Sequence, residues 1–151
     1  IGQVVIAGHT PAVKAAMAEA DNMGARLTRE IAISVPCHCS LLSDAALKFQ
    51  EVLNNTPIKT PKRAVISNVD LSIHDNPDVM RPLLAKQLYS PVRWVETIQA
   101  MQQAGITHII ECGPGGVLAG LVKRIDRSIS ALSINTPDNL EKILSLEGIS
   151  K

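Results

Sequence analysis

Apolar and polar positions along the chain follow two alternating periods. Short apolar runs bounded by glycine, proline or asparagine predict β-strands over 3–7, 25–33, 64–67, 107–112 and 129–134. Between them, apolar residues recur every three or four positions and predict helices over about 11–23, 40–53, 75–88, 90–101, 117–125 and 138–146. Strands and helices alternate nearly throughout. This order predicts an α/β fold with a mainly parallel sheet and helices on both faces.

Residues 33–42 join a predicted strand to a predicted helix. The apolar run reaches Val35 and is stopped by Pro36, because proline cannot donate a hydrogen bond to a central strand ladder. Ser40 can cap the helix that follows, so His38 lies on the turn between them. Side chains on such turns are held by a rigid sheet yet open to solvent. We therefore regard His38 as a candidate for chemistry, the alternative being a capping or core histidine.

Composition narrows the classes of protein to consider. A chain of 151 residues with 46% hydrophobic residues can bury a real core in a single domain. Its net charge of +1, spread along the chain, and its 2% aromatic residues do not favour a nucleic-acid or anionic-lipid partner. Because no apolar run approaches the ~20 residues of a membrane helix, we expect a soluble, cytoplasmic protein without a membrane partner.

Cysteine usage agrees with a reducing compartment. Three cysteines, Cys37, Cys39 and Cys112, make a poor disulfide framework. The run Cys37-His38-Cys39 resembles part of a metal clip, but structural zinc sites use four ligands in separated pairs, and the sequence has no second pair. We expect no metal site and no permanently bound cofactor.

The glycine-rich segment 113–116 follows a predicted strand and precedes a predicted helix. Such a turn can cradle a phosphate, but the segment matches neither the P-loop nor the dinucleotide-binding pattern. A tight turn, whose glycines let the backbone approach another segment, is the favoured interpretation. The chain also contains no G-x-S-x-G nucleophile elbow, so the serine that a histidine on a strand-end turn would serve is missing.

Four segments resemble, in order and spacing, successive motifs of the bacterial malonyl-CoA:acyl carrier protein transacylases of type II fatty acid synthesis. They are Ser-Val-Pro-Cys-His-Cys at 34–39, Ser-Asn-Val-Asp at 67–70, Gln-Leu-Tyr-Ser-Pro-Val-Arg-Trp at 87–94 and Glu-Cys-Gly-Pro-Gly at 111–115. The opening residues 2–8 are similar to the small subdomain of that family. The resemblance implies the C-terminal part of an α/β-hydrolase-like parallel-sheet core at 34–151, preceded by a remnant of a small ferredoxin-like subdomain at 1–33.

The resemblance also implies roles for two residues. His38 matches the catalytic histidine, and the backbone carbonyl of Gln87 would hold its imidazole through the other ring nitrogen. The nucleophilic serine of the family lies in a G-H-S-x-G elbow in the N-terminal portion of the enzyme. Malonyl-CoA, acyl carrier protein and that N-terminal portion are therefore the implied partners, and the chain alone is expected to be inactive. Cys37 replaces a serine usual in close relatives, at a position that helps set acyl choice in related acyltransferases.

Two other interpretations stay open. A serine hydrolase of related architecture would orient its histidine with an Asp or Glu instead of a carbonyl. A non-catalytic module that binds carrier protein or CoA would need no nucleophile. If the chain is a partial enzyme, the segments leading to Val35 and Ile66 should expose an apolar patch on the side toward which His38 points.

Overall fold

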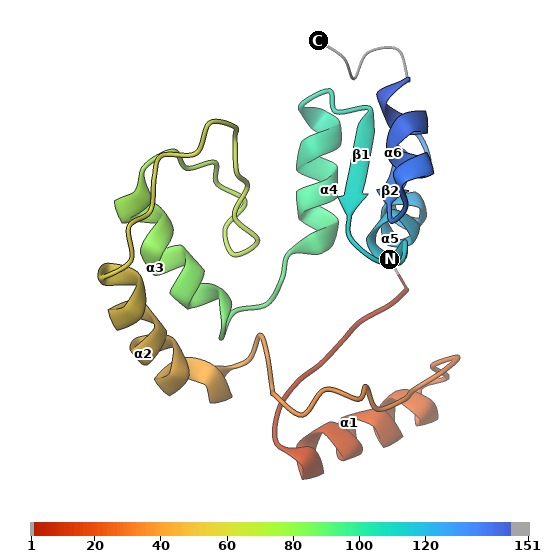
Figure 1. Ribbon diagram of the computed structural model, residues 1–151. Coiled ribbons are helices and arrows are strands. Elements are labelled where there is room, and N and C mark those ends of the chain that lie inside the picture. Colours follow the sequence, from red (N-terminus) through yellow and green to blue (C-terminus); the bar gives the residue numbers. More distant parts are fainter. Residues whose placement is uncertain (1, 146–151) are drawn as a thin grey trace. The chain divides into compact units, whose positions relative to one another are not determined.

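Figure 1 shows the computed structural model of the protein, which describes residues 2–145. The described chain forms two compact units, Gly2–Arg93 and a second unit that begins at Trp94. In order, its elements are α1 (Thr10–Asn22), the short 3-10 helix η1 (Ser40–Leu42), α2 (Ser43–Asn54), α3 (Pro77–Gln87), α4 (Trp94–Gln103), β1 (His108–Cys112), α5 (Val117–Ile125), β2 (Ser130–Ile134) and α6 (Pro137–Leu144). None of the helices in this part of the chain is long and apolar enough to cross a membrane.

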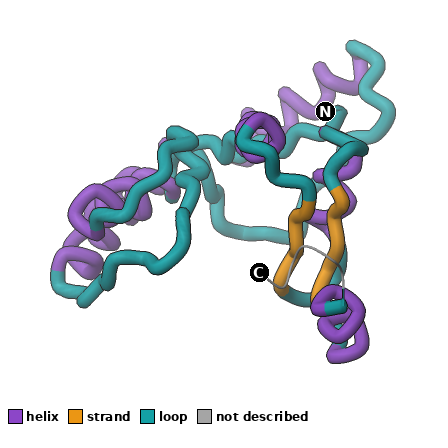
Figure 2. Tube along the Cα trace, turned by 90° about the horizontal axis from the view of Figure 1, so that it is seen from above, coloured by secondary structure: helices purple, strands orange, loops and turns teal. Residues whose placement is uncertain are grey.

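The second unit is a βαβ motif flanked by two further helices. β1 and β2 pair in parallel, with His108 opposite Ser130 and Cys112 opposite Ile134, and α5 makes the crossover between them. The two strands lie side by side in Figure 2, where they are orange. One cluster forms the core of this unit and consists of Ile98, Ala119, Val122, Ile129 and Ala131, with Trp94 and Met101 packed against it. The mixed α/β class is therefore confirmed.

The glycine-rich segment is a tight turn, as expected. Gly113 and Gly115 have φ angles of 145° and 100°, a region that residues with a side chain rarely adopt. The turn leads from β1 into α5, whose first residues have no side-chain cap at Gly116. Instead, the backbone N–H of Ala119 donates to Oε2 of Glu111 at 2.9 Å. A strand carboxylate thus satisfies a free N–H at the helix N-terminus and complements the helix dipole there.

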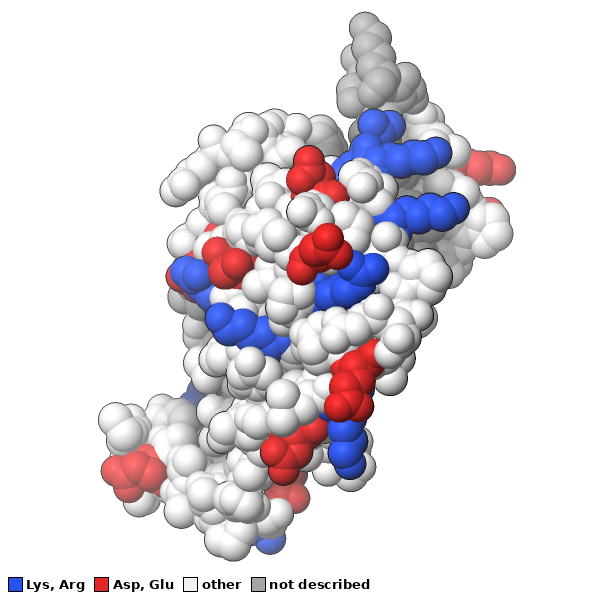
Figure 3. Space-filling model, turned by 90° about the vertical axis from the view of Figure 1, so that its left-hand side faces the viewer, with Lys and Arg blue, Asp and Glu red and all other residues white. Residues whose placement is uncertain are grey.

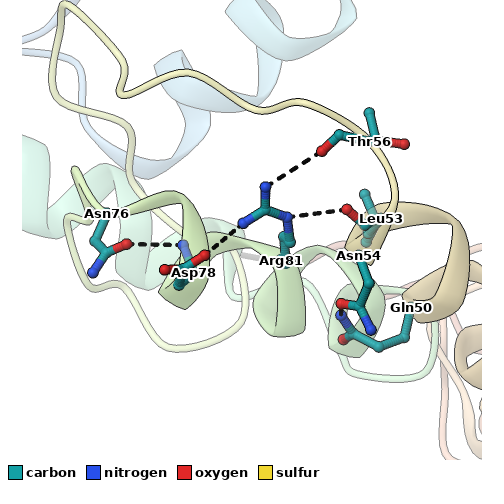
Figure 4. Close-up of polar contacts among 7 residues, drawn as sticks. All are labelled: Gln50, Leu53, Asn54, Thr56, Asn76, Asp78 and Arg81. Carbon is teal, nitrogen blue, oxygen red and sulfur yellow. Dashed lines mark hydrogen bonds and ion pairs between the residues drawn. The ribbon is translucent and has the colours of Figure 1, made fainter.

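In the first unit, Arg81 joins α3 to the end of α2 (Figure 4). Its Nε donates to the carbonyl of Leu53 at 3.0 Å, and one terminal nitrogen donates to the carbonyl of Thr56 at 3.3 Å. The other terminal nitrogen lies 2.6 Å from Oδ1 of Asp78. The last carbonyls of a helix have no partner within the helix. Arg81 therefore adds side-chain donors from α3 to carbonyls at and just beyond the C-terminus of α2.

A short hairpin precedes α3. Ile66 and Ile73 form an isolated antiparallel bridge, and the N–H of Ser67 donates to the carbonyl of Ser72 at 2.9 Å. The carbonyl of Asn68 at its tip accepts from the N–H of Arg93 at 3.1 Å. The chain segment that follows α3 is thereby tied back to the hairpin that precedes it.

Three of the predicted strands are wrong. Residues 3–7 and 25–33 are not assigned as strands, and 64–67 contributes only the single bridge at Ile66. An extended segment becomes a strand only when a neighbour satisfies its backbone N–H and C=O groups. No such neighbour is present among the described residues, and side chains such as Val4 (84% exposed) and Ile33 (65% exposed) are uncovered. The expected larger parallel sheet is therefore reduced to β1 and β2 in the part of the chain that the structure describes.

The helix boundaries also differ in places. The predicted helix over 90–101 begins only at Trp94, and the N–H of Arg93, just before it, is bound to the carbonyl of Asn68 in the hairpin. A link of six residues therefore separates α3 from α4, which were expected to abut near Gln87. The predicted end of the last helix at Leu146 lies outside the described residues. The boundary predicted between residues 33 and 34 stays a prediction.

Candidate active site

The backbone of His38 is held in an unusual conformation. Its φ angle is 63°, in the left-handed region, which costs a residue other than glycine about 1–3 kcal/mol. Its N–H donates to the carbonyl of Leu88 at 2.8 Å, and the preceding N–H of Cys37 donates to the carbonyl of Val35 at 2.8 Å. Two backbone hydrogen bonds thus fix the chain at His38 and at the residue before it, so the strain is maintained by the surroundings.

The imidazole of His38 is oriented by a second backbone carbonyl. Its Nδ1 lies 2.9 Å from the carbonyl oxygen of Gln87, the last residue of α3. A carbonyl can only accept, so Nδ1 carries the proton in the neutral ring and Nε2 carries the lone pair. The carbonyl of Gln87 is available because it is one of the last in its helix. The predicted contact between His38 and the backbone of Gln87 is confirmed, whereas their catalytic roles stay predictions.

This arrangement suits a general base. The side chain of His38 is exposed, so Nε2 is accessible to a second molecule or segment. A hydrolase of the Ser-His-Asp type holds its histidine with a carboxylate, which adds a negative charge beside the ring. Here the partner of the ring is a neutral carbonyl, which fixes the tautomer without adding charge. The geometry therefore disfavours the hydrolase interpretation.

The two thiols beside His38 have different surroundings. Sγ of Cys39 donates to the carbonyl of Pro36 at 3.3 Å, whereas Cys37 is exposed. Within residues 2–145, no three His, Cys, Asp or Glu side chains are grouped so that they could hold a metal ion. The run of Cys37, His38 and Cys39 thus forms no metal clip of three ligands in this structure.

Apolar side chains are exposed on the segments that lead to the site. Ile33 and Val35 are 65% and 51% exposed just before His38, and Val65 is 45% exposed beside Ile66. Exposed apolar groups are common singly, but a contiguous patch usually marks a surface that binds another chain. A contiguous apolar patch on the side toward which His38 points stays a prediction. Charged groups of both signs are interspersed on the surface in Figure 3.

The sequence reasoning missed a polar network near the hairpin. The hydroxyl of Ser72 donates to Oδ1 of Asp70 at 2.5 Å, and the Ser72 hydroxyl oxygen also contacts Nε2 of His74. The hydrogen bond from the Ser72 hydroxyl is the largest influence on Asp70 and lowers its pKa. Desolvation raises the pKa, the Ser72 N–H lowers it further, and the result is a pKa of about 2. The signal in the sequence is an aspartate two residues before a serine, because an Asp side chain in a turn commonly accepts from the backbone N–H two residues on.

The network is not a catalytic triad. Ser72 has one hydroxyl proton, and a carboxylate only accepts, so that proton points to Asp70. His74 must then donate its Nε2–H to Ser72, and it has no lone pair there with which to activate the serine. The direction of these hydrogen bonds, His74 to Ser72 to Asp70, indicates a structural role.

The chain is similar in sequence to known proteins over part of their length. No protein-family model matches the chain. It is 45% identical over 134 residues to the malonyl CoA-acyl carrier protein transacylase of Haemophilus influenzae, covering 89% of this chain and 43% of that protein. It is 40% identical over 145 residues to that of Escherichia coli strain K12, covering 96% and 47%. The chain thus spans less than half the length of these relatives.

Solved structures give the same result for the fold. The acyl-carrier-protein S-malonyltransferase of Burkholderia pseudomallei 1710b superposes with a TM-score of 0.87 at 39% identity, over 91% of this chain and 45% of that one. A malonyl-transacylase solved in complex with a type II PKS acyl-carrier protein superposes with a TM-score of 0.87 at 38% identity, over 93% and 45%. In sequence and in fold, the chain is therefore similar to somewhat less than half of a malonyl CoA-acyl carrier protein transacylase.

Proposed function

We propose that this chain supplies the general base of a malonyl CoA-acyl carrier protein transacylase. The observation that carries the proposal is the contact of 2.9 Å between Nδ1 of His38 and the carbonyl of Gln87. It leaves Nε2 as the basic atom, on an exposed ring beside apolar segments that a second polypeptide can cover. The implied partners are malonyl-CoA, acyl carrier protein and a segment bearing the G-H-S-x-G serine.

In this proposal His38 moves one proton in each half of the reaction. Nε2 takes the proton of the serine hydroxyl as its oxygen attacks the thioester carbonyl of malonyl-CoA. The imidazolium returns that proton to the departing CoA thiolate, which leaves a malonyl-serine ester. In the second half Nε2 takes the proton of the phosphopantetheine thiol, the thiolate attacks the ester, and the proton returns to the serine. The donors and acceptors balance without a redox cofactor.

The neutral partner of His38 fits a reaction between two thioesters. Histidine exchanges protons readily near neutral pH, so the same ring can serve as base and as acid. The carbonyl of Gln87 keeps Nδ1 protonated in the neutral ring and imidazolium alike, which holds Nε2 in one direction through both halves. Malonyl is the acyl group that the relatives indicate, and exposed Cys37 lies next to the base, where it can contact the acyl group.

A chimera tests the proposal. The matched 43% of the Haemophilus influenzae transacylase is replaced by this chain, and transfer of labelled malonyl from malonyl-CoA to acyl carrier protein is measured. We expect transfer, and a loss of about 10²–10⁴-fold in kcat for His38→Ala, the range that general-base catalysis contributes. The kcat of Gln87→Ala should stay within about threefold of that of the unsubstituted chimera, because the backbone carbonyl remains after the substitution.

His9→Ala is the matched control, since His9 is exposed at the start of α1. A folded chimera that transfers no malonyl group, or a His38→Ala chimera as active as the control, would contradict the proposal. The purified chain alone should transfer no malonyl group, because a base without a nucleophile forms no acyl-enzyme. Robust transfer by the chain alone would instead place a nucleophile within it.

A further inference from the structure

The hairpin before α3 is closed by a polar network of Asp70, Ser72 and His74. We define the Asp70 lock as the hydrogen bonds from the N–H of Ser72 (3.1 Å) and the hydroxyl of Ser72 (2.5 Å) to Oδ1 of Asp70, together with the contact between Ser72 and His74. Leu71 lies inside the lock with a φ of 64°, a conformation that is costly for a branched side chain. The lock therefore holds a backbone geometry that Leu71 would not keep by itself.

The hairpin is connected to both ends of α3. On one side it runs within three residues into Asn76, whose side chain caps the first turn of α3 by accepting from the N–H of Asp78 at 2.8 Å. On the other side, the carbonyl of Asn68 accepts from the N–H of Arg93, beyond the C-terminus of α3. This last hydrogen bond closes residues 68–93 into a loop that contains the whole helix.

The closed loop also contains both carbonyls that hold His38. Gln87, the last residue of α3, and Leu88, the next residue, precede the tie at Arg93, and their carbonyls bind the ring and the backbone N–H of His38 respectively. A segment fixed at both ends moves less than one fixed at one end only, because its conformational freedom is smaller. We infer that Asp70 and Ser72 are positioning residues for His38, acting through the tie between Asn68 and Arg93. That this positioning serves catalysis rests on the proposed function, whereas the structural coupling of Asp70 and Ser72 to His38 does not.

The second unit contains a matched control. Oδ1 of Asp126 accepts from the N–H of Ser128 at 2.7 Å and from its hydroxyl at 2.6 Å, the same local motif as at Asp70 and Ser72. That motif belongs to the other compact unit and encloses Arg127 rather than a residue with a positive φ. Asp126→Ala therefore removes the same two hydrogen bonds without touching the hairpin.

Amide hydrogen exchange by NMR, on the 151-residue chain, tests the coupling. In Asp70→Ala the N–H of Arg93 should exchange about fivefold faster or more, the size expected from weakening one backbone hydrogen bond, and the N–H of His38 at least about twofold faster. The ¹⁵N shifts of the His38 ring should show a smaller fraction of the Nδ1–H tautomer. Asp126→Ala should accelerate exchange near Ser128 and leave His38 unchanged.

Two further variants keep the test decisive. Asp70→Asn retains a side-chain oxygen that can accept from the N–H of Ser72, so it should restore most of the protection at Arg93. Ser72→Ala removes the hydroxyl that contacts both Asp70 and His74, and it replaces Asp70→Ala in the test if that variant does not fold. Unchanged exchange at Arg93 and His38 in Asp70→Ala and Ser72→Ala would overturn the inference. So would an acceleration of exchange at the His38 N–H in Asp126→Ala as large as that in Asp70→Ala. The assay measures no acyl transfer, so its failure is separate from a failure of the proposed function.

Discussion

Replacing Arg81 by alanine should destabilise the first unit by about 2–3 kcal/mol. The hydrogen bond to Leu53, from a charged donor that is only 18% exposed, contributes about 1.5 kcal/mol. Interaction of the cation with the C-terminus of α2 and the longer bond to Thr56 add about 0.5–1 kcal/mol. The pair with Asp78 adds little, because that carboxylate is 86% exposed.

Two spectroscopic signals separate the units in this measurement. Circular dichroism during urea unfolding follows the helices of both units, whereas the fluorescence of Trp94, the single tryptophan, follows only the core of the second unit, against which it packs. Arg81→Ala should move the helix transition to lower urea and leave most of the fluorescence transition in place. Asp78→Ala is the matched control and should cost below about 1 kcal/mol.

Arg81→Lys discriminates further, because lysine keeps the charge but loses the planar group that reaches two carbonyls at once. It should recover less than half of the lost stability. A cost of Arg81→Ala below about 0.5 kcal/mol, within the range of ordinary surface substitutions, would refute the assigned role. So would an Asp78→Ala variant as unstable as Arg81→Ala, since the exposed ion pair would then carry the effect.

Two further outcomes are expected. Glu111→Ala should cost about 1 kcal/mol or more in the second unit, measured by Trp94 fluorescence, because it removes the carboxylate that accepts from the N–H of Ala119, and Glu111→Gln should recover part of the lost stability. The folded-state pKa of Asp70, about 2, lies below the ordinary value of 3.8 for an aspartate, so its contribution to stability is present above about pH 4 and lost as the pH falls through 2. The difference in stability between the wild-type chain and Asp70→Asn should therefore shrink across that window, by a modest amount because Asp70 is 41% exposed; a difference that grows on acidification would contradict this.

The sequence predicted the second unit well and the first unit less well. This unit contains one self-contained βαβ motif, made of the strands at 108–112 and 130–134 and the helix between them. The local hydrophobic periodicity was therefore sufficient to predict its elements. The run at 3–7 has the same apolar character, but a strand also requires a partner, which a local pattern does not report. Gly113 and Gly115 were correctly assigned to a tight turn, because their positive φ angles are what glycine permits.

For the candidate site, the contact between His38 and Gln87 followed from family resemblance and not from local pattern, since 49 residues separate them. The role of Arg81 was not predictable, because the pattern of an amphipathic helix predicts only that its arginine is exposed to solvent. The Asp70 lock depends on a hairpin that the sequence predicted only as a single strand.

The two contacts of His38 have a consequence for how this site tolerates change. Both acceptors are main-chain oxygens of consecutive residues at a helix end, so substituting the side chains of Gln87 and Leu88 leaves the acceptors in place. An alanine scan would pass over the group that orients the ring. A one-residue insertion within α3 would not, because it rotates the helix end by about 100° and advances it by about 1.5 Å. The site is therefore robust to point substitution and fragile to length variation, and loop or helix indels are the changes by which its geometry can be altered.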